Sequence, residues 1–487
     1  MNFSASLGLH QLLDVSNELS RFCRLLYVFA TCVIGMLGLP VSVAATEKPV
    51  VSWIVLGEQG QAVVRSLTYE GHCPLLKQDG KSAPMRVRAK PETVAQRPTA
   101  SDEKDSKASD FAVLTCEAAL SANTKKADVD GVVIPIPKAI PQRIVVLGDT
   151  GCRMKKADDA FQACNDAQKW AFAEVIKKAV SLHPDLVIHV GDYHYRENPC
   201  PEGNMGCKGS PWGYGYDVWY ADFFEPAKPL LLAAPWVMVR GNHESCVRAG
   251  QGYWRFLDPR PYVKGRDCNQ EKFDMIGDYS SPYAIPLGKS GGTSSQLIVF
   301  DTAKVPGKKV SKDDPARVIY AQQFAQVEQF SQNADFNIFM NHHPILGFAA
   351  SHKEDGSVEF KPGNQVLQAI MQERQPQRLF PAGIKAVLSG HVHLFQAVTY
   401  TTDHPTQFGS GNGGTAMDSA LPDELPAGTT PFPNAVVDHF SNSNRDGFLL
   451  LERKANQWQM TAYDIAGKAM TQCLMSGTES KCSVLNK

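Results

Sequence analysis

RIVVLGDTG (residues 143–151) and LVIHVGDYHY (residues 186–195) are the two segments that decide the fold. Each is a short run of aliphatic residues that leads into Gly-Asp, a pattern typical of a buried strand followed by a tight turn. Between them, residues 166–182 (DAQKWAFAEVIKKAVSL) carry apolar positions at helical spacing. The three segments together predict a strand, a helix and a second strand in succession.

The same alternation continues toward the C-terminus. Further buried strands are expected at residues 236–239, 297–300, 336–340 and 384–388, and helices near 319–332 and 363–375. Residues 447–462 (GFLLLERKANQWQMTA) predict a two-stranded hairpin that closes a sheet. Short apolar strands separated by helices indicate an α/β layered fold.

The composition is that of a large globular protein. Of the 487 residues, 43% are hydrophobic and 20% are charged, which excludes disordered and fibrous classes. Lys and Arg number 49 and Asp and Glu 50, for a net charge of −1. This balance gives no overall attraction to nucleic acid, so we expect no nucleic acid duplex as partner.

A polar turn follows five of the expected strands. The turns are GDTG (148–151), GDYHY (191–195), GNHE (241–244), NHHP (341–344) and GHVH (390–393). In open α/β sheets, sites form outside the carboxyl ends of the strands, so the five turns are expected to converge on one crevice.

The side chains in these turns suit a pair of metal ions. Asp, Asn, His and Tyr offer hard oxygen and borderline nitrogen donors, which favour iron, manganese and zinc. A carboxylate can bridge two cations about 3.5–4 Å apart, and such pairs activate water and stabilise both oxygens of an in-line phosphoryl displacement. The motif set therefore predicts a dinuclear hydrolytic centre.

The five motifs, in this order, resemble those of the calcineurin-type metallophosphoesterase superfamily, and within it they are most similar to purple acid phosphatases. Gly151 stands where many relatives carry a metal-binding histidine. Tyr195, three residues after Asp192, stands where purple acid phosphatases carry a tyrosinate bound to ferric iron. The resemblance implies an α/β/β/α metallophosphoesterase sandwich with a small N-terminal β-rich domain.

The resemblance also implies roles for individual residues. The first ion, Fe(III), would be held by Asp149, Asp192, Tyr195 and His393. The second, divalent ion (Fe, Mn or Zn) would be held by Asp192, Asn242, His342 and His391, with Asp192 as the bridge. His243 would bind the phosphate and protonate the leaving alkoxide while a metal-bound hydroxide attacks phosphorus.

The sequence leaves two roles open for several residues near the expected ligands. Tyr193 is the alternative if Tyr195 is only an aromatic wall, and His343 either faces substrate or packs. Glu244 either orients His243 or caps a strand. Two loops rich in glycine and proline, residues 196–217 and 408–433, are expected to form rims of the pocket.

The predicted function is hydrolysis of small phosphorylated substrates by an acid phosphomonoesterase. Two alternatives stay open: a phosphodiesterase or nucleotide hydrolase that uses the same metals, and a non-catalytic protein that binds a partner in the cell envelope. Model monoester and diester substrates would separate the two enzymes, and a normal metal content without activity would favour the third.

The N-terminus predicts export. An apolar run of 15 residues (25–39) follows Arg21 and Arg24 and precedes small residues, which indicates a signal peptide over residues 1–45 with cleavage near Ala44 or Ala45. An uncleaved anchor and a misplaced start codon are the alternatives. Cleavage would leave no stable membrane span and place the protein in the periplasm or outside the cell.

The cysteines agree with an oxidising compartment. Of the 12 cysteines, ten lie beyond the leader, and no Cys-x-x-Cys spacing points to zinc. Sequence alone does not fix connectivity. We expect neighbours to pair, as 73–116, 152–164, 200–207, 246–268 and 473–482.

The domain division follows a change in pattern. Residues 46–138 read as a β-rich domain, residues 134–142 (IPIPKAIPQ) as a proline-rich boundary, and residues 139–487 as the catalytic domain. By analogy with larger purple acid phosphatases, the first domain is expected to be a β-sandwich. The polar segment 90–110 lacks aromatic residues and is predicted to be a mobile loop.

Overall fold

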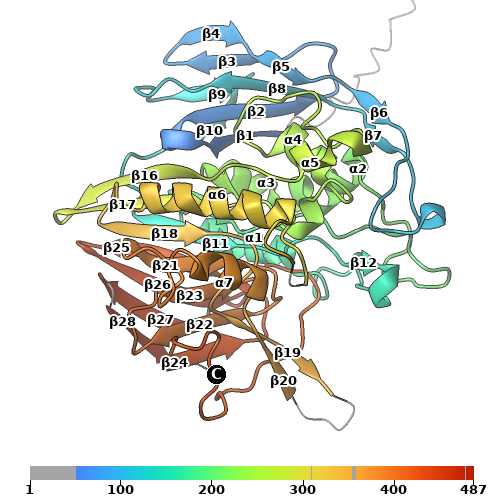
Figure 1. Ribbon diagram of the computed structural model, residues 1–487. Coiled ribbons are helices and arrows are strands. Elements are labelled where there is room, and N and C mark those ends of the chain that lie inside the picture. The colour runs from blue at the N-terminus through green and yellow to red at the C-terminus, as the bar shows by residue number, and fades with distance from the viewer. Residues whose placement is uncertain (1–50, 309, 354–357, 478, 487) are drawn as a thin grey trace, which may run out of the picture. The chain divides into compact units, whose positions relative to one another are not determined.

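The computed structural model describes residues 51–308, 310–353, 358–477 and 479–486 (Figure 1). The expected leader, its cleavage site and residues Cys23 and Cys32 lie outside these ranges. Within them, no helix combines the length and the apolar character that crossing a bilayer requires.

The larger of the two main sheets has eleven strands. Its four central strands, β11, β14, β15 and β1, run parallel, and hairpins continue it antiparallel on both sides. In spatial order the strands are β28 (Glu479–Val484), β27 (Ala469–Ser476), β26 (Gln457–Asp464), β25 (Gly447–Lys454), β11 (Arg143–Leu147), β14 (Leu186–His189), β15 (Trp236–Met238), β1 (Val51–Leu56), β2 (Ala62–Thr68), β8 (Leu114–Ala119) and β5 (Arg86–Ala89). The C-terminal hairpin predicted from the sequence is confirmed as β25 and β26.

The second main sheet has seven strands, and β17, β18, β21 and β23 at its centre are parallel. In spatial order its strands are β16 (Tyr283–Ser290), β17 (Thr293–Val299), β18 (Phe336–Met340), β21 (Ile384–Ser389), β23 (Thr406–Ser410), β22 (Phe395–Tyr400) and β24 (Val437–Ser443). The smaller sheets are formed by β10 (Val132–Ile134), β9 (Ala127–Val129), β3 (Leu75–Gln78) and β4 (Lys81–Pro84), by β6 (Glu92–Val94) with β7 (Ser109–Phe111), by β12 (Met154–Lys155) with β13 (Ala160–Phe161), and by β19 (Phe348–His352) with β20 (Val358–Pro362).

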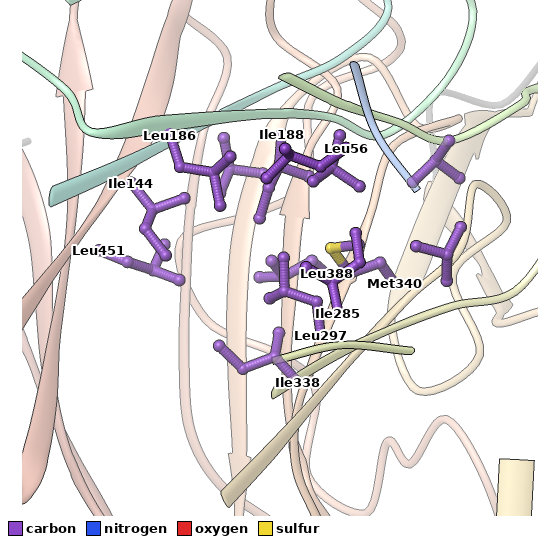
Figure 2. Packing of buried hydrophobic residues seen from close by; sticks show 14 of the residues in the cluster. Leu56, Ile144, Leu186, Ile188, Ile285, Leu297, Ile338, Met340, Leu388 and Leu451 are labelled. Atoms are coloured by element: carbon purple, nitrogen blue, oxygen red, sulfur yellow. The ribbon is translucent and has the colours of Figure 1, made fainter. Parts of the chain in front are cut away.

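The main core lies between the two large sheets (Figure 2). Because side chains alternate along a strand, Ile144 and Val146 of β11 face this core, where they join Leu297 and Ile338 of the other sheet. Each such fully buried aliphatic side chain contributes about 1.5–3 kcal/mol. Strands buried on both faces explain why the segments read as unbroken apolar runs.

Helices cover the outer faces of both sheets. Val145 and Leu147, the other half of β11, pack with Phe172 and other helical side chains in a second cluster. A third cluster joins Phe339 of β18 to the helices α6 and α7. The helices are α1 (Phe172–Ser181), α2 (Tyr216–Trp219), α3 (Glu225–Leu231), α4 (Gly250–Phe256), α5 (Asp274–Gly277), α6 (Pro315–Phe330) and α7 (Gln365–Gln372). The layering is the α/β/β/α sandwich that the sequence predicts.

The N-terminal segment is β-rich, as expected, but its strands enter the large sheet. β1 pairs with β15 in parallel, with Val55 opposite Trp236, and with β2 on its other side. Residues 51–486 belong to one compact unit. The predicted boundary at 138/139 is therefore a change in sequence pattern and does not divide two sheets.

The prediction of a mobile loop at residues 90–110 is wrong. β6 and β7 pair within this segment, and Val94 is buried. The Arg97 guanidinium donates to the Cys268 carbonyl at 2.6 Å and forms an ion pair with Asp274. The amide of Ala100 donates to the carbonyl of Val247 at 2.8 Å. Long-range polar contacts order a segment whose own composition is polar and lacks aromatic residues.

All five predicted disulfides are present. They join Cys73 to Cys116, Cys152 to Cys164, Cys200 to Cys207, Cys246 to Cys268 and Cys473 to Cys482. Local pairing succeeds because each bond closes a hairpin or a short loop, with at most 43 residues between the partners.

A buried ion cluster fixes the N-terminal strands to the rest of the chain. Glu117 on β8 forms ion pairs with Arg65 Nε at 3.1 Å and with Arg88 Nη1 at 2.8 Å, and both arginine side chains are fully buried. Arg65 donates onward to the carbonyls of Phe256 and Asp258. Burial raises the pKa of Glu117, but the charges of Arg65 and Arg88 outweigh it and hold this pKa below its usual range.

We predict that Glu117→Gln lowers the free energy of unfolding by about 3–5 kcal/mol at neutral pH, because it leaves two buried cations without a counter-charge. Chemical denaturation measures the change. The depressed pKa means that wild-type Glu117 stabilises the fold above the ordinary glutamate value of 4.5 and loses this contribution as the pH falls below it. The gap between wild type and variant should therefore narrow in acid.

Glu174→Gln is the matched control. Glu174 pairs with Lys177 at 3.4 Å on the exposed face of α1, so its loss should cost less than about 0.5 kcal/mol. Equal effects of the two substitutions would contradict the assigned role of Glu117.

Candidate metal centre and active site

Five turns meet at the carboxyl ends of the parallel strands. β11, β14 and β15 in one sheet and β18 and β21 in the other each lead directly into one of the five polar motifs. Since parallel strands present their carboxyl ends at one edge, and the two sheets face each other, the motifs from both layers come together there.

Glycines let the two carboxylates approach neighbouring backbone. A Cβ on Gly241 would overlap the Asp192 carboxylate, and a Cβ on Gly390 would overlap that of Asp149. Asp149 and Asp192 both adopt left-handed backbone, with φ of 56° and 59°. Such conformations are costly for non-glycine residues and persist only where surrounding contacts fix them.

Glu244 supplies those contacts at the second motif. Its Oε2 accepts the amides of Asp192 at 2.9 Å and Gly241 at 3.0 Å, and its Oε1 accepts the amide of Tyr193 at 2.8 Å. Glu244 thus fixes the turn that carries Asp192. Among the described residues, no hydrogen bond or ion pair joins Glu244 to the His243 side chain.

Four of the expected ligands meet around the phenol of Tyr195. Its oxygen lies 2.9 Å from Asp149 Oδ1, 3.0 Å from Asp192 Oδ2 and 2.9 Å from His393 Nε2. All four side chains are buried. This group is the one that the sequence assigns to the first ion.

The other expected ligands meet around Asn242. Its Oδ1 lies 3.1 Å from His342 Nε2 and 2.9 Å from His391 Nδ1. His342 Nε2 is also 3.1 Å from Asp192 Oδ2, so the same carboxylate oxygen belongs to both groups. Ligand atoms of Asp192, His342 and His391 all lie within 4.8 Å of one another.

The hydrogen bonding of the histidines fits a cation. His342 Nδ1 donates to the carbonyl of Val190 at 2.9 Å, and His393 Nδ1 to that of Ala416 at 2.8 Å. This leaves both Nε2 lone pairs facing carboxylate, amide and phenol oxygens. A second nitrogen fixed by a backbone carbonyl is typical of metal-binding histidine. The residues present therefore fit a pair of metal ions, and ligation itself stays a prediction.

Tyr195, and not Tyr193, faces this centre. The Tyr193 hydroxyl donates to the carbonyl of Val239 at 2.9 Å, on the other side of the turn. Burial raises the pKa of Tyr195 well above its usual value, and the charges of Asp149 and Asp192 raise it further, so a phenolate here needs a cation beside it. A Cβ on Gly151 would lie too close to the backbone of Tyr193 and Tyr195. The turn formed by residues 193–195, called the tyrosine turn below, therefore occupies the space that a side chain at position 151 would need.

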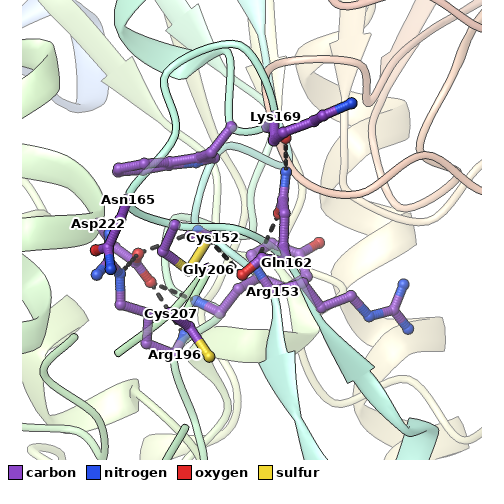
Figure 3. Close-up of a disulfide and its surroundings, with 12 residues drawn as sticks. Cys152, Arg153, Gln162, Asn165, Lys169, Arg196, Gly206, Cys207 and Asp222 are labelled. Atoms are coloured by element: carbon purple, nitrogen blue, oxygen red, sulfur yellow. Dashed lines mark hydrogen bonds and ion pairs between the residues drawn. A yellow bond between two sulfur atoms is a disulfide. The ribbon is translucent and has the colours of Figure 1, made fainter. Parts of the chain in front are cut away.

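Asp222 holds the tyrosine turn in place (Figure 3). Its carboxylate accepts the amide of Tyr195 at 2.8 Å, the amide of Cys152 at 3.1 Å and the Nε of Arg196 at 2.6 Å. It follows Tyr195 by 27 residues, and nothing in the sequence pattern marks it for this role.

His243 pairs with Glu197, which the sequence analysis missed. Glu197 Oε1 lies 2.7 Å from His243 Nδ1, and His243 Nε2 is 3.9 Å from Asp192 Oδ2. The His243 ring packs on that of Tyr195 with centroids 4.0 Å apart. Burial raises the pKa of Glu197, but Arg248 and His243 lower it to about 2, so Glu197 is ionised. An acidic residue five positions after Asp192 was the available signal.

Burial also acts on His243 itself. It lowers the pKa of this imidazole to about 4, with a further contribution from the charge of Arg248, while Asp192 and Glu197 oppose the shift. His243 is thus neutral near pH 7 and takes up its second proton only at acidic pH.

The remaining candidates fall on the edge of the centre. His343 Nδ1 lies 3.1 Å from the Thr302 hydroxyl, and its ring centroid is 4.2 Å from that of His391. From the loop 408–433, Asp418 accepts the amide of His393 at 3.0 Å. Gln162 accepts the amide of Ala416 at 3.1 Å and donates to the carbonyl of Lys169 (Figure 3). It therefore connects the loop 408–433 to the loop that the Cys152–Cys164 disulfide closes.

The sequence and the fold can now be compared with known proteins. Residues 142–395 match the calcineurin-like phosphoesterase family. Purple acid phosphatase PPD1 from yellow lupin (Lupinus luteus) seeds is a similar solved structure, with 14% identity, a TM-score of 0.50, and coverage of 88% of this chain and 73% of that one. The structure of PhoD is 12% identical over 89% of this chain and 91% of that one, with a TM-score of 0.46. Among curated proteins, none matches this sequence.

At these identities the structural likeness concerns the fold alone. The family match covers more than half of the chain, and it spans all five motifs that the two sheets bring together. The chain therefore belongs to the calcineurin-like phosphoesterase family and is a phosphoester hydrolase.

Proposed function

We propose that the protein is an exported phosphomonoesterase that acts at acidic pH with two metal ions. One observation carries the proposal: Asp192 Oδ2 lies 3.0 Å from the Tyr195 phenol and 3.1 Å from His342 Nε2. A single carboxylate oxygen thus connects two sets of donors, which suits a bridging ligand.

The donor chemistry assigns the two ions. Asp149, Asp192, Tyr195 and His393 would hold Fe(III), because a phenolate is a strong donor to a trivalent cation. Asp192, Asn242, His342 and His391 would hold a divalent ion: Fe, Mn or Zn. When bound, such a pair activates water and neutralises charge on the phosphoryl oxygens.

His243 is positioned to handle the proton of the leaving group. Glu197 Oε1 lies 2.7 Å from Nδ1, and Nε2 on the other side of the ring is 3.9 Å from Asp192 Oδ2. In the imidazolium form, which acidic pH favours, Nε2–H can donate to a phosphate oxygen and then to the departing alkoxide. The ionised Glu197 stabilises the imidazolium from which that proton leaves.

The cysteine framework supports an exported protein. Five disulfides persist only in an oxidising compartment, which favours the periplasm or the exterior of the cell. Three of them involve Cys152, Cys200 and Cys246, each within ten residues of a motif that carries an expected ligand.

We predict that the purified, metal-loaded protein hydrolyses p-nitrophenyl phosphate, with higher kcat/KM on this monoester than on bis-p-nitrophenyl phosphate. Release of nitrophenolate measures both rates, and elemental analysis should give two metal ions per chain. Absence of turnover on both esters from acidic to neutral pH, at full metal content, would sink the proposal.

We predict that Tyr195→Phe abolishes a visible charge-transfer band that the wild-type protein shows, because the phenolate bound to Fe(III) is removed. The absorption spectrum and the iron content are the measurements. Tyr193→Phe is the matched control and should keep the band, since the Tyr193 hydroxyl donates to the Val239 carbonyl. A colourless wild-type protein with two zinc ions would remove the iron assignment and leave the hydrolase.

We predict that Glu197→Gln lowers kcat by about 10–100-fold with little change in metal content, because the imidazolium of His243 loses its counter-charge. The pH profile of kcat should shift as well, which a purely structural loss would not produce. Glu202→Gln, an exposed change in the same loop, should leave kcat within about twofold of wild type. Loss of metal in Glu197→Gln would argue against this assignment.

A further inference from the structure

Arg248 is an arginine beside the centre with an unused donor. It follows the GNHE motif, and 15% of its side chain is exposed. Its Nη1 is buried and has no hydrogen-bond partner within the described residues. Among the residues that the structure describes, it is the only terminal guanidinium nitrogen that is buried without a hydrogen-bond partner.

The terminal nitrogens of the buried Arg240 are both paired, in contrast to Nη1 of Arg248. Arg240 donates from Nη1 to the Gly277 carbonyl at 2.6 Å and from Nη2 to Asp301 at 2.6 Å. A buried donor left unpaired costs about 1–3 kcal/mol, so the state of Arg248 calls for a partner that the protein itself does not provide.

The surroundings of Arg248 identify that partner as an anion at the reaction centre. Its Nε lies 3.6 Å from Glu197 Oε1, the oxygen that faces His243 Nδ1 at 2.7 Å. Burial lowers the pKa of Arg248, but the charges of Glu197 and Asp192 raise it above its usual value, so the guanidinium is fully charged beside the site.

Neutralising Glu197 does not account for this geometry. A separation of 3.6 Å is beyond a hydrogen bond, and Glu197 Oε1 lies closer to His243 Nδ1, at 2.7 Å. Arg248 Nη1 therefore remains free to donate to an oxyanion, a class of ligand for which the guanidinium group is suited.

We propose that Arg248 binds the terminal oxygens of the substrate phosphate and so selects phosphomonoesters, which carry three such oxygens, over diesters, which carry two. A monoester carries three terminal oxygens, and because its second proton has a pKa of about 6, the number of oxygens distinguishes it from a diester at acidic pH more than the charge does. A diester has two terminal oxygens and one charge, and an ester group takes the place of the third oxygen. The inference rests on the proposed function and specifies its substrate class.

The test compares Arg248→Gln with wild type on the two nitrophenyl esters. We expect kcat/KM for the monoester to fall about 10–100-fold, mainly through KM, and that for the diester to change less than about threefold. Arg248→Lys, which keeps the charge without the guanidinium group, should lie between. Calorimetric titration of inorganic phosphate into each loaded protein should show at least about tenfold weaker binding to Arg248→Gln.

Arg153→Gln is the matched control. Arg153 also lies at the edge of the centre and is 21% exposed; its Nε is buried without a hydrogen-bond partner, but its terminal Nη2 is paired with Asp158 at 2.7 Å. Its guanidinium extends away from the Cys152 disulfide (Figure 3). The same loss of charge there should change the monoester KM less than about threefold.

Three results would overturn the inference: equal losses on both esters in Arg248→Gln, unchanged phosphate binding, or an effect of Arg153→Gln as large as that of Arg248→Gln. If Arg248→Gln loses metal, Arg248→Lys carries the comparison, and an unchanged ester preference there counts against the inference. Wild-type protein that turns over neither ester refutes the proposed function instead, and the phosphate titration still tests Arg248 by itself.

Discussion

The structure of the centre depends on one buried carboxylate. Asp192 Oδ2 faces the phenol of Tyr195 and the imidazole of His342 at nearly equal distances, and Oδ1 accepts the amide of His243 at 2.8 Å. This placement requires left-handed backbone at Asp192 and a glycine at position 241. Glu244 offsets the backbone strain by accepting three amides around the turn. Glu244 of the GNHE motif thus fixes the backbone of the GDYHY motif.

The tyrosine turn is likewise held by a single carboxylate that accepts several hydrogen bonds, that of Asp222. Asp222 is buried, and it fixes the amides of Tyr195 and Cys152 and the side chain of Arg196 at once. It lies in the helical segment between β14 and β15, so packing of that segment on the outer face of the large sheet transmits order to the centre. A side chain far from any motif in sequence therefore determines where the phenol points.

The N-terminal strands belong to the same eleven-stranded sheet as the first three motifs. β1 and β2 extend the sheet that carries the first three motifs, and the Glu117 cluster joins these strands to residues 254–260. The segment around Ala100 in turn bonds to Val247, the neighbour of Arg248. The edge of the centre near His243 is accordingly built from two distant parts of the chain.

Local apolar runs and glycine turns in the sequence predict an α/β layered fold, the succession of strands and polar turns along the chain, and the convergence of these turns on one crevice. The α/β/β/α sandwich and the seven expected ligands were implied by the family resemblance, and pairing of neighbouring cysteines was an expectation that the five disulfides confirm. Only the tertiary structure decided the partnership of Glu197 with His243, the supporting role of Asp222, the ordering of residues 90–110 and the entry of β1 into the main sheet. Each of these depends on polar contacts or strand pairing between distant segments, for which local composition carries no signal.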